Sequence, residues 1–400
     1  MNKLRNFHLY GLISLLLNTF ISVTGFAQSN VNDSQASAEV NSSLLFVGTF
    51  TAGNDGIKSA GIYVYEMDNT TGALKYVGIG ANTADPSYLV IHPNKKWLYA
   101  VNELNSNNEN NIGTLSSFRI DLKSKQLQLI NTVPSHGNSP CYVTVDKTGK
   151  YVMTANYNSG TIAVFPISKD GALGEATTMI LHQGKGPVVG RQEGPHAHMI
   201  TQDSDKRFVY AVDLGIDKVM VYTLDTLQGK LIATDHNVST NPGAGPRHLV
   251  FHPNQQWAYL VHELDGFIEA FTIDKSSGAL TMFQTIPNFP EGMKMQPASA
   301  DIHITPNGLY LYTTNRGELN NIGMYSIDQK SGTLRLLGHQ PTHGKTPRNF
   351  VIDPSGKFVL VANQNSSNIV TFRIDQASGK LIETGLETSV PHPVCLKFLE

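Results

Sequence analysis

The sequence repeats a pattern of short runs in which apolar and polar residues alternate. A first run such as YLVIHP or HLVFHP is followed by a second such as WLYAVNE or FVYAVDL, and then by a third such as GTLSSFRID or NIVTFRID. Alternation with a period of two predicts β-strands. A turn precedes a fourth run, and it contains Gly171, Gly229, Gly278, Gly332 or Gly379 in five of the units. Glycine accepts the positive φ of tight hairpins, so each unit is predicted to hold four antiparallel strands.

The unit recurs about every fifty residues, with a proline shortly before each first strand. These prolines are Pro86, Pro140, Pro195, Pro246, Pro297, Pro347 and Pro391. The segment LLFVGTF near the start matches a second strand, and VCLKF at the end matches a first strand. We therefore predict an all-β fold for residues 44–400. It is a seven-bladed β-propeller with four-stranded antiparallel blades, whose last blade is closed by the N- and C-terminal strands. A β-sandwich would produce this spacing only by coincidence.

The first residues have the pattern of a secretory signal peptide. Lys3 and Arg5 precede a mainly apolar stretch over residues 9–23 and a small-x-small GFA tripeptide. We predict a signal peptide at residues 1–27, since the apolar stretch is short for a membrane span of ~20 residues. Residues 28–43 contain almost nothing apolar and are predicted to be a disordered linker. The protein is then periplasmic or secreted, with no membrane span after cleavage.

Composition and charge limit the kinds of ligand and partner that the protein is expected to bind. The net charge is −2 and no long basic run is present, which argues against nucleic-acid binding. The two cysteines, Cys141 and Cys395, fall on innermost strands two blades apart and are predicted to be free, buried thiols. His196 and His198 could share a strand face, but no third metal ligand follows from the spacing, so no metal or cofactor is predicted. A G-x-S-x-G motif and a phosphate-binding loop are both missing. We expect a monomer.

The topology places candidate chemistry at one rim of the axis. In a four-stranded blade the connection into strand one and the connection out of strand two lie at the same end. That rim gathers three arginines with histidines and carboxylates; they include His196, Arg247 and Arg348 before or in first strands, and Glu103, Glu263, Asn315 and Arg316 after second strands. A glycine-rich loop over residues 184–194 is expected to overhang the rim. His92 and His252 lie at the opposite end, as turn residues. Arginine matches carboxylate or phosphate, but Arg–Glu pairs that only join blades remain an alternative.

Four motifs in these segments carry a family resemblance. They are QEGPHAHM, NPGAGPRHLVFHPN, YLVHELDG and TTNRG. With them the chain resembles the propeller-type 6-phosphogluconolactonases, grouped with the fungal 3-carboxy-cis,cis-muconate lactonizing enzymes, from LLFVGTFT to VCLKF. The resemblance implies chemistry on lactone rings. The His, two Arg and Glu proposed for the muconate branch correspond to His196 or His198, Arg247, Arg316 and Glu263.

The leading hypothesis is a lactonase that hydrolyses an anionic sugar lactone. Arg247, Arg316 and Arg348 would hold its phosphate or carboxylate, with Glu103 and Asn315 beside them. Glu263 or His198 would activate water. A muconate-type cycloisomerase and a non-enzymatic propeller that binds a carbohydrate or protein are the alternatives. The expected export argues for a lactone or sugar acid found outside the cytoplasm.

Overall fold

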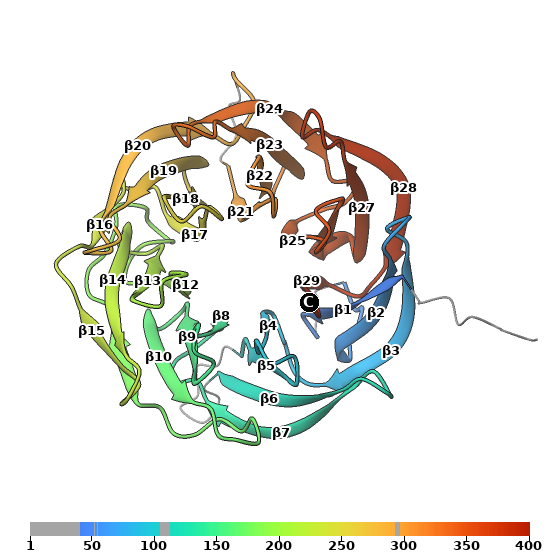
Figure 1. The fold of residues 1–400 in the computed structure, drawn as a ribbon, viewed down its shortest axis with the longest axis horizontal. Helices are drawn as coiled ribbons and strands as arrows, with labels where there is room; N and C mark the ends of the chain where they lie inside the picture. The colour runs from blue at the N-terminus through green and yellow to red at the C-terminus, as the bar shows by residue number, and fades with distance from the viewer. Residues whose placement is uncertain (1–40, 52, 54, 105–112, 293–296) are drawn as a thin grey trace, which may run out of the picture. The chain divides into compact units, whose positions relative to one another are not determined.

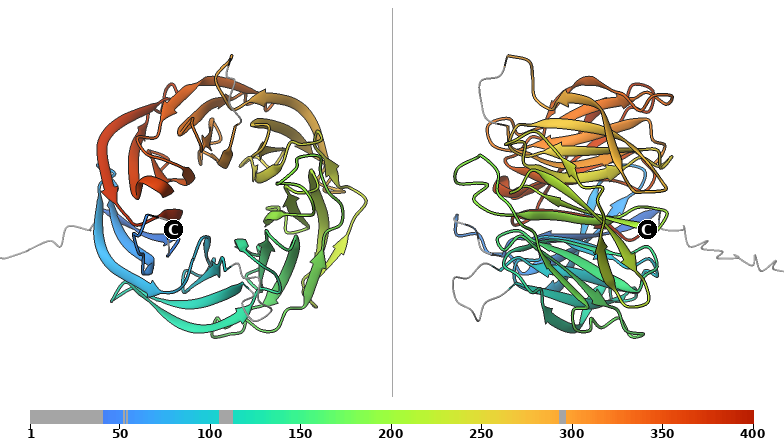
Figure 2. Two further views of the ribbon diagram at one scale, coloured as in Figure 1. Left: turned by 180° about the vertical axis from the view of Figure 1, so that it is seen from behind. Right: turned by 90° about the vertical axis from the view of Figure 1, so that its left-hand side faces the viewer.

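The alternating runs form strands that pair into seven antiparallel sheets around one axis (Figure 1). The computed structural model describes residues 41–51, 53, 55–104, 113–292 and 297–400. Each sheet is one blade, whose first strand in the sequence unit is innermost and whose last strand is outermost. The connections between strands lie at the two faces of the ring (Figure 2). The seven-bladed propeller predicted from the sequence is therefore confirmed.

In each of the first four blades four strands follow one another from the axis outward, and the fourth blade has one strand more. The first three are β29 (Pro393–Phe398), β1 (Ser42–Thr49), β2 (Gly61–Asp68) and β3 (Leu74–Asn82); β4 (Leu89–Ile91), β5 (Trp97–Asn102), β6 (Thr114–Asp121) and β7 (Gln126–Pro134); and β8 (Pro140–Val145), β9 (Tyr151–Asn156), β10 (Thr161–Pro166) and β11 (Thr178–Leu181). The fourth is β12 (Ala197–Gln202), β13 (Phe208–Asp213), β14 (Lys218–Asp225) and β15 (Lys230–Ala233), with β16 (Val238–Ser239) also paired to β14.

The last three blades follow the same plan. They are β17 (Pro246–Phe251), β18 (Trp257–His262), β19 (Phe267–Ile273) and β20 (Leu280–Pro287); β21 (Ser299–Ile304), β22 (Tyr310–Asn315), β23 (Asn321–Ile327) and β24 (Leu334–Pro341); and β25 (Pro347–Ile352), β26 (Phe358–Asn363), β27 (Asn368–Ile374) and β28 (Leu381–Ser389). A short 3₁₀ helix, Gln364–Ser366, links β26 to β27.

The two ends of the chain close the ring in one shared blade. Strand β29 pairs antiparallel with β1, with Val47 opposite Leu396. This pairing removes two strand edges that would otherwise be exposed. Strand β1 begins at Ser42, so the propeller starts two residues before the predicted boundary. The predicted signal peptide and the linker up to residue 40 lie outside the described residues. Within the described part of the chain, no helix is long and apolar enough to cross a membrane.

The hydrophobic core lies between neighbouring blades. One cluster, for example, joins Tyr259 and Ile268 of one blade to Leu311 and Tyr325 of the next. The blades are also joined by a repeated hydrogen bond from a second-strand tyrosine to a turn glycine of the next blade: Tyr99 to Gly171, Tyr210 to Gly278, Tyr259 to Gly332 and Tyr312 to Gly379. Glycine is required at these turns because φ is positive and the neighbouring ring is close. At Gly332 φ is +76°, and an added Cβ would lie 2.5 Å from the Trp257 ring.

Two further predictions are confirmed. Cys141 and Cys395 are free and buried in β8 and β29, two blades apart, and burial raises the pKa of the Cys395 thiol to about 11. His252 is a turn residue at the opposite end of the axis from the predicted rim. Its Nδ1 accepts from the Asn254 amide, and its Nε2 lies 2.9 Å from the Gly308 carbonyl of the next blade. His92 makes the corresponding 3.0 Å contact with the Gly149 carbonyl.

A bulge near the start of the inner strands decides which side chains face the axis. The pairing register shifts between Pro140 and Tyr142 in β8 and between Pro246 and His248 in β17, and shifts of the same kind occur in β12 and β25. At each shift the pairing skips one residue of the inner strand, which has no partner on the second strand. Bulges re-aim side chains and are frequent next to active sites. Here the skipped residues are Cys141, His198, Arg247 and Arg348.

Candidate active site at the rim of the axis

A cavity of about 200 Å³ lies at the rim predicted from the topology. We call it the rim cavity; it is lined by Glu103, Cys141, Tyr157, Arg191, His198, Glu263, Arg316 and Arg348. These residues come from every blade except the one that contains both chain ends. Because the lining is collected from six separate blades, the cavity exists only when the ring is closed.

In four blades the residue after the second strand lines the cavity, whereas the last residue of that strand does not. Glu103, Tyr157, Glu263 and Arg316 each follow a second strand and line the cavity. Asn315, the last residue of β22, is fully buried inside its blade. Its Nδ2 donates to the Asn288 carbonyl at 2.6 Å, and its Oδ1 accepts from Ser299 at 2.7 Å. The structure therefore places Asn315 in a blade-stabilising network and not at the cavity, where substrate contact was expected.

The bulge register separates the two candidate histidines. Ala197 pairs with Asp213 as Pro246 pairs with His262, so His198 occupies the same position as Arg247. His198 lines the rim cavity. His196 lies outside the lining: its ring stacks on Tyr157 at 4.5 Å, and its Nδ1 is 2.9 Å from the Tyr157 carbonyl. His196 stacks on the Tyr157 ring, whereas His198 contacts it edge-on. Within the described residues, no group of three His, Cys, Asp or Glu could hold a metal ion.

Glu263 is the centre of an arginine cluster. Its Oε1 accepts from Arg191 at 2.5 Å, while its Oε2 accepts from Arg316 at 2.7 Å and from Arg247 at 3.0 Å. Burial alone would raise the pKa of Glu263, but Arg316, Arg247 and Arg191 together hold it well below its usual range. A carboxylate with so low a pKa is a poor proton acceptor. The geometry therefore indicates that Glu263 holds the arginines in place, and that it is poorly suited to act as a base.

Arg247 is the most deeply buried of these arginines. Its side chain is 2% exposed, against 15% for Arg316, 20% for Arg348 and 40% for Arg191. Burial and the neighbouring Arg316 lower its pKa to about 10. Its Nη1 donates to the Ala300 carbonyl and lies 3.3 Å from His248 Nε2. Arg247 does not line the cavity, so it acts through Glu263, and direct anion contact falls to the other three arginines.

A buried carboxylate fixes the orientation of His248 behind Arg247. Asp301 accepts from His248 Nδ1 at 2.8 Å, from His303 Nε2 at 2.9 Å and from the Asn349 amide. Burial would raise the pKa of Asp301, but His303 and His248 hold it well below its usual range. Burial and Arg247 lower the pKa of His248 to about 4, so its ring is neutral near pH 7. With the proton on Nδ1, His248 Nε2 is free to accept from Arg247.

The second carboxylate of the cavity is more loosely held. Glu103 Oε2 lies 3.6 Å from Arg348 Nη2 and has no hydrogen bond among the described residues. Burial raises the pKa of Glu103, although Arg348 works against the rise. Arg348 also lies over the Phe50 ring, at 5.3 Å from its centroid. Because its only charged partner in the described part of the chain is at 3.6 Å, the Arg348 guanidinium can still bind another anion.

Arg191 is a site residue that the sequence argument missed. It lies in the glycine-rich loop predicted to overhang the rim, and the loop is held by Gln192, whose Nε2 donates to the Leu214 carbonyl and to Asp217, both at 2.7 Å. The loop has no strand period from which the direction of a side chain could be derived. Its only signal was an arginine next to the GPHAH segment.

His198 is the imidazole that lines the cavity. Its Nδ1 is buried without a hydrogen-bond partner among the residues described, and the ring packs edge-on against Tyr157 and His248 at 5.6 and 5.2 Å. Burial, and next Arg247 and His248, lower its pKa well below the usual value. The imidazole is therefore neutral around pH 7 and can accept a proton, although the lowered pKa makes it a weaker base than a free histidine.

The cavity as a whole favours anions. The three lining guanidinium groups of Arg191, Arg316 and Arg348 outnumber the two carboxylates of Glu103 and Glu263, and Arg247 behind Glu263 adds a further positive charge. Guanidinium groups bind carboxylate and phosphate through paired N–H donors. An anion bound here would meet fixed positive charge next to a neutral imidazole.

Comparisons with known proteins identify the family of the chain. The family model "Lactonase, 7-bladed beta-propeller" matches residues 44–398. A 6-phosphogluconolactonase of Bacillus subtilis is 35% identical over 354 residues, which cover 88% of this chain and 97% of that protein. A second, from Formosa agariphila, is 34% identical over 342 residues, covering 84% of this chain and 94% of the relative.

A solved structure extends the likeness to three dimensions. The periplasmic gluconolactonase of Pseudomonas aeruginosa is 34% identical, with a TM-score of 0.84, covering 90% of this chain and 99% of that one. The family model spans the whole propeller, and relatives above 30% identity match nearly end to end. The chain therefore belongs to the family of seven-bladed β-propeller lactonases.

Proposed function

We propose that this lactonase hydrolyses a sugar lactone that carries an anionic group, at the rim cavity. The observation that carries the proposal is the excess positive charge around a neutral imidazole in a cavity of about 200 Å³. The family makes the protein a carboxylic-ester hydrolase, and the B. subtilis and Formosa relatives are named for a phosphorylated sugar lactone. Three partly exposed arginines supply the positive charge that would bind the anionic group of such a substrate.

Binding is assigned to the partly exposed arginines. Arg348 and Arg191 would hold the phosphate or carboxylate of the substrate, because each still presents N–H donors to the cavity. Arg316 would lie next to the lactone carbonyl. Glu263 and the buried Arg247 keep this set in place, since moving either would leave an unpaired buried charge.

The chemical step is assigned to His198. Its imidazole removes a proton from water, and the water oxygen forms a bond to the lactone carbonyl carbon. The oxyanion of the tetrahedral intermediate is stabilised by Arg316. The bond from this carbon to the ring oxygen then breaks, and the ring oxygen takes the proton from His198. The product is the open-chain acid, and the imidazole is neutral again.

The proposal is tested with a phosphorylated and an unphosphorylated lactone. Acid release from 6-phosphogluconolactone and from gluconolactone would be followed near pH 6, with spontaneous hydrolysis subtracted. Because a charge-assisted hydrogen bond contributes about 1.5–3 kcal/mol, Arg348→Met should lower kcat/KM for the phosphorylated lactone about 10- to 100-fold. The neutral lactone should be much less affected.

Arg335→Met is the matched control, since Arg335 is exposed on the outer strand β24. It should leave both rates within about twofold, because a surface charge this far from the site is screened. Equal losses for both lactones in Arg348→Met would contradict the anion-binding role. No turnover of either lactone would contradict the proposed function itself.

A cycloisomerase acting on a muconolactone-type ring is the competing chemistry, because it would use the same anion-binding arginines. The reaction run in ¹⁸O-labelled water separates the two. Hydrolysis incorporates one solvent oxygen into the product carboxylate, whereas ring opening by elimination incorporates none.

We further propose that the chain is exported through its N-terminal signal peptide and acts in the periplasm or outside the cell. The support is the pattern of residues 1–27 together with the periplasmic gluconolactonase among the structural neighbours. Fractionation of cells that express the full chain tests this. Mature protein starting near Gln28 in the periplasmic or extracellular fraction is the expected result, and full-length protein in the cytoplasm would contradict it.

A further inference from the structure

A second pocket lies on the other side of the layer that carries the rim cavity. We call it the lower pocket; its volume is about 340 Å³, within the range of small-molecule sites. Consecutive residues divide between the two spaces. Cys141 lines the rim cavity and Tyr142 the lower pocket, and His198 and Met199 divide in the same way. The two sites are therefore separated by one layer of side chains.

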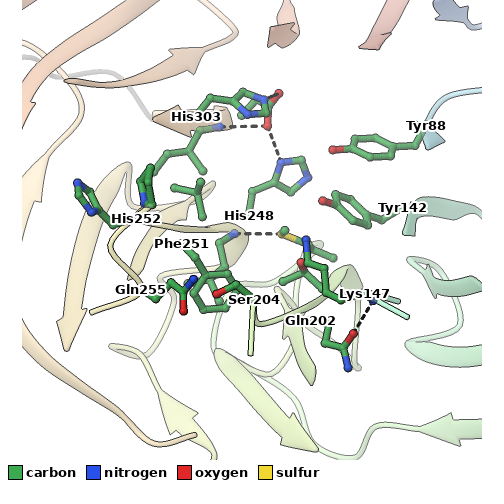
Figure 3. A pocket seen from close by; sticks show the side chains of 17 residues that line it. Tyr88, Tyr142, Lys147, Gln202, Ser204, His248, Phe251, His252, Gln255 and His303 are labelled. Carbon is green, nitrogen blue, oxygen red and sulfur yellow. Dashed lines mark hydrogen bonds and ion pairs between the residues drawn. The ribbon is translucent and has the colours of Figure 1, made fainter. Parts of the chain in front are cut away.

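The lower pocket is lined by groups that the proposed hydrolysis does not use. Figure 3 shows the Tyr88 and Tyr142 hydroxyls directed toward His248, with His303 above them and Lys147 and Gln202 below. The Tyr88 and Tyr142 rings stack at 4.1 Å, which makes a rigid aromatic wall. Phe251 and Met199 add apolar surface.

One buried donor beside this pocket has no acceptor in the described part of the protein. Gln202 is 2% exposed, and its Oε1 accepts from the Lys147 backbone N–H at 2.7 Å. That bond holds Oε1 and leaves Nε2, which has no hydrogen-bond partner among the residues that the structure describes. Buried amide N–H groups are almost always paired, so an unpaired one needs an explanation. A ligand oxygen is one, provided that the side chain turns, because Nε2 is buried from the pocket as well as from solvent.

The other polar groups offer both donors and acceptors. His303 Nε2 lies on the Asp301 carboxylate, so Nδ1 is the ring nitrogen left for a ligand. Ser204 and the tyrosine hydroxyls can act in either sense. A phosphate or carboxylate needs donors only, whereas a hydroxyl group uses a donor and an acceptor together. This mixed set therefore matches hydroxyl groups.

The net charge of the lower pocket also favours a neutral ligand. Apart from the histidines, the charged side chains that line the lower pocket are Lys147 and Asp301, whose charges cancel. The lining of the rim cavity, in contrast, has one excess positive charge, and the buried Arg247 lies behind it. We propose that the lower pocket is a second binding site, for a neutral polyhydroxylated molecule of monosaccharide size. This proposal does not depend on the lactonase reaction, since binding is measured without turnover.

Titration of the purified protein with D-glucose, followed by ligand-observed NMR or calorimetry, tests the proposal. Saturable binding is expected. Gln202→Leu and Lys147→Met should each weaken it about three- to tenfold, the effect of one lost hydrogen bond. Lys147 is exposed, so Lys147→Met should keep the fold even if Gln202→Leu does not. Arg348→Met, in the rim cavity, should leave glucose affinity unchanged within about twofold.

Crystals soaked with D-glucose give the second readout. Sugar density beside Tyr142 and Gln202 is expected. The proposal is overturned if glucose does not bind saturably, or if it binds equally well to both lower-pocket variants. It is also overturned if Arg348→Met abolishes binding or the density lies in the rim cavity. Because the lactonase assay is separate, failure here leaves the proposed hydrolysis standing, and failure of hydrolysis leaves this site standing.

Discussion

Replacing His198 is the sharpest test of the catalytic assignment. In His198→Gln the side chain keeps much of its volume but cannot take a proton from water. General-base catalysis contributes about 10²–10⁴-fold to a rate, which corresponds to about 3–5 kcal/mol of the activation barrier. We therefore expect kcat on 6-phosphogluconolactone to fall by about 10²–10⁴, with a much smaller change in KM because the arginines remain.

The same structure predicts a small effect of this substitution on stability. His198 Nδ1 has no hydrogen-bond partner among the described residues, and its ring makes two edge-on aromatic contacts. Each such contact contributes about 0.5–1.5 kcal/mol beyond its buried area. The free energy of unfolding should fall by only about 1–2 kcal/mol, measured by urea denaturation. A large loss of activity with a small loss of stability distinguishes a catalytic histidine from a packing one.

His196 provides the matched control on the same segment. Its ring stacks on Tyr157, which His198 contacts edge-on, but it does not line the rim cavity. His196→Gln should therefore keep kcat within about threefold, as expected for a group that touches neither substrate nor reacting water. If His196→Gln lost activity while His198→Gln kept it, the register argument that selects His198 would be refuted.

The remaining predictions concern the groups that hold the site. Glu263→Gln should lower the free energy of unfolding by about 3–5 kcal/mol, because it leaves the buried Arg247 without its carboxylate; a urea titration showing a loss below about 1 kcal/mol would contradict this. Asp301→Asn should raise KM about tenfold with kcat nearly unchanged, since His248 can then turn its proton toward Arg247 and disturb the arginine cluster; unchanged steady-state kinetics would refute that positioning role. Because of His262, the free energy of unfolding should decrease as the pH becomes alkaline. Burial lowers its pKa, but Asp265 and Glu269 outweigh this and raise it to about 9. Its contribution, roughly 3 kcal/mol at most, is complete below pH 6.5 and is lost as pH rises through about 9. Thermal unfolding between pH 6 and 10 should show this loss in the wild type and not in His262→Gln.

Much of this architecture could be predicted from residue order. Alternation with a period of two identifies strands because side chains leave a strand on alternate sides. The repeat of about fifty residues counts the blades, and the match between LLFVGTF and VCLKF predicts the shared blade. The same reasoning placed the rim correctly, because strand direction alone decides which connections share an end of a blade. Glu103, Glu263, Arg316 and Arg348 are found where it expected them.

Which side chain at that rim faces the cavity was decided only by the tertiary structure. A bulge adds one unpaired residue, and a shift of one residue reverses the facing of a side chain. The strand pattern therefore could not choose between His196 and His198, or predict that Asn315 turns into its blade. Arg191 comes from a loop whose path is set by Gln192 and distant partners. The pKa values of His198 and Glu263 likewise depend on charges that are far apart in the chain and meet only when the ring closes. The sequence by itself thus determined the repeat, the ring and the rim, because these follow from local alternation and strand direction. Only the closed ring decided the facing, burial and charge state of each side chain at the axis, because these depend on contacts between blades.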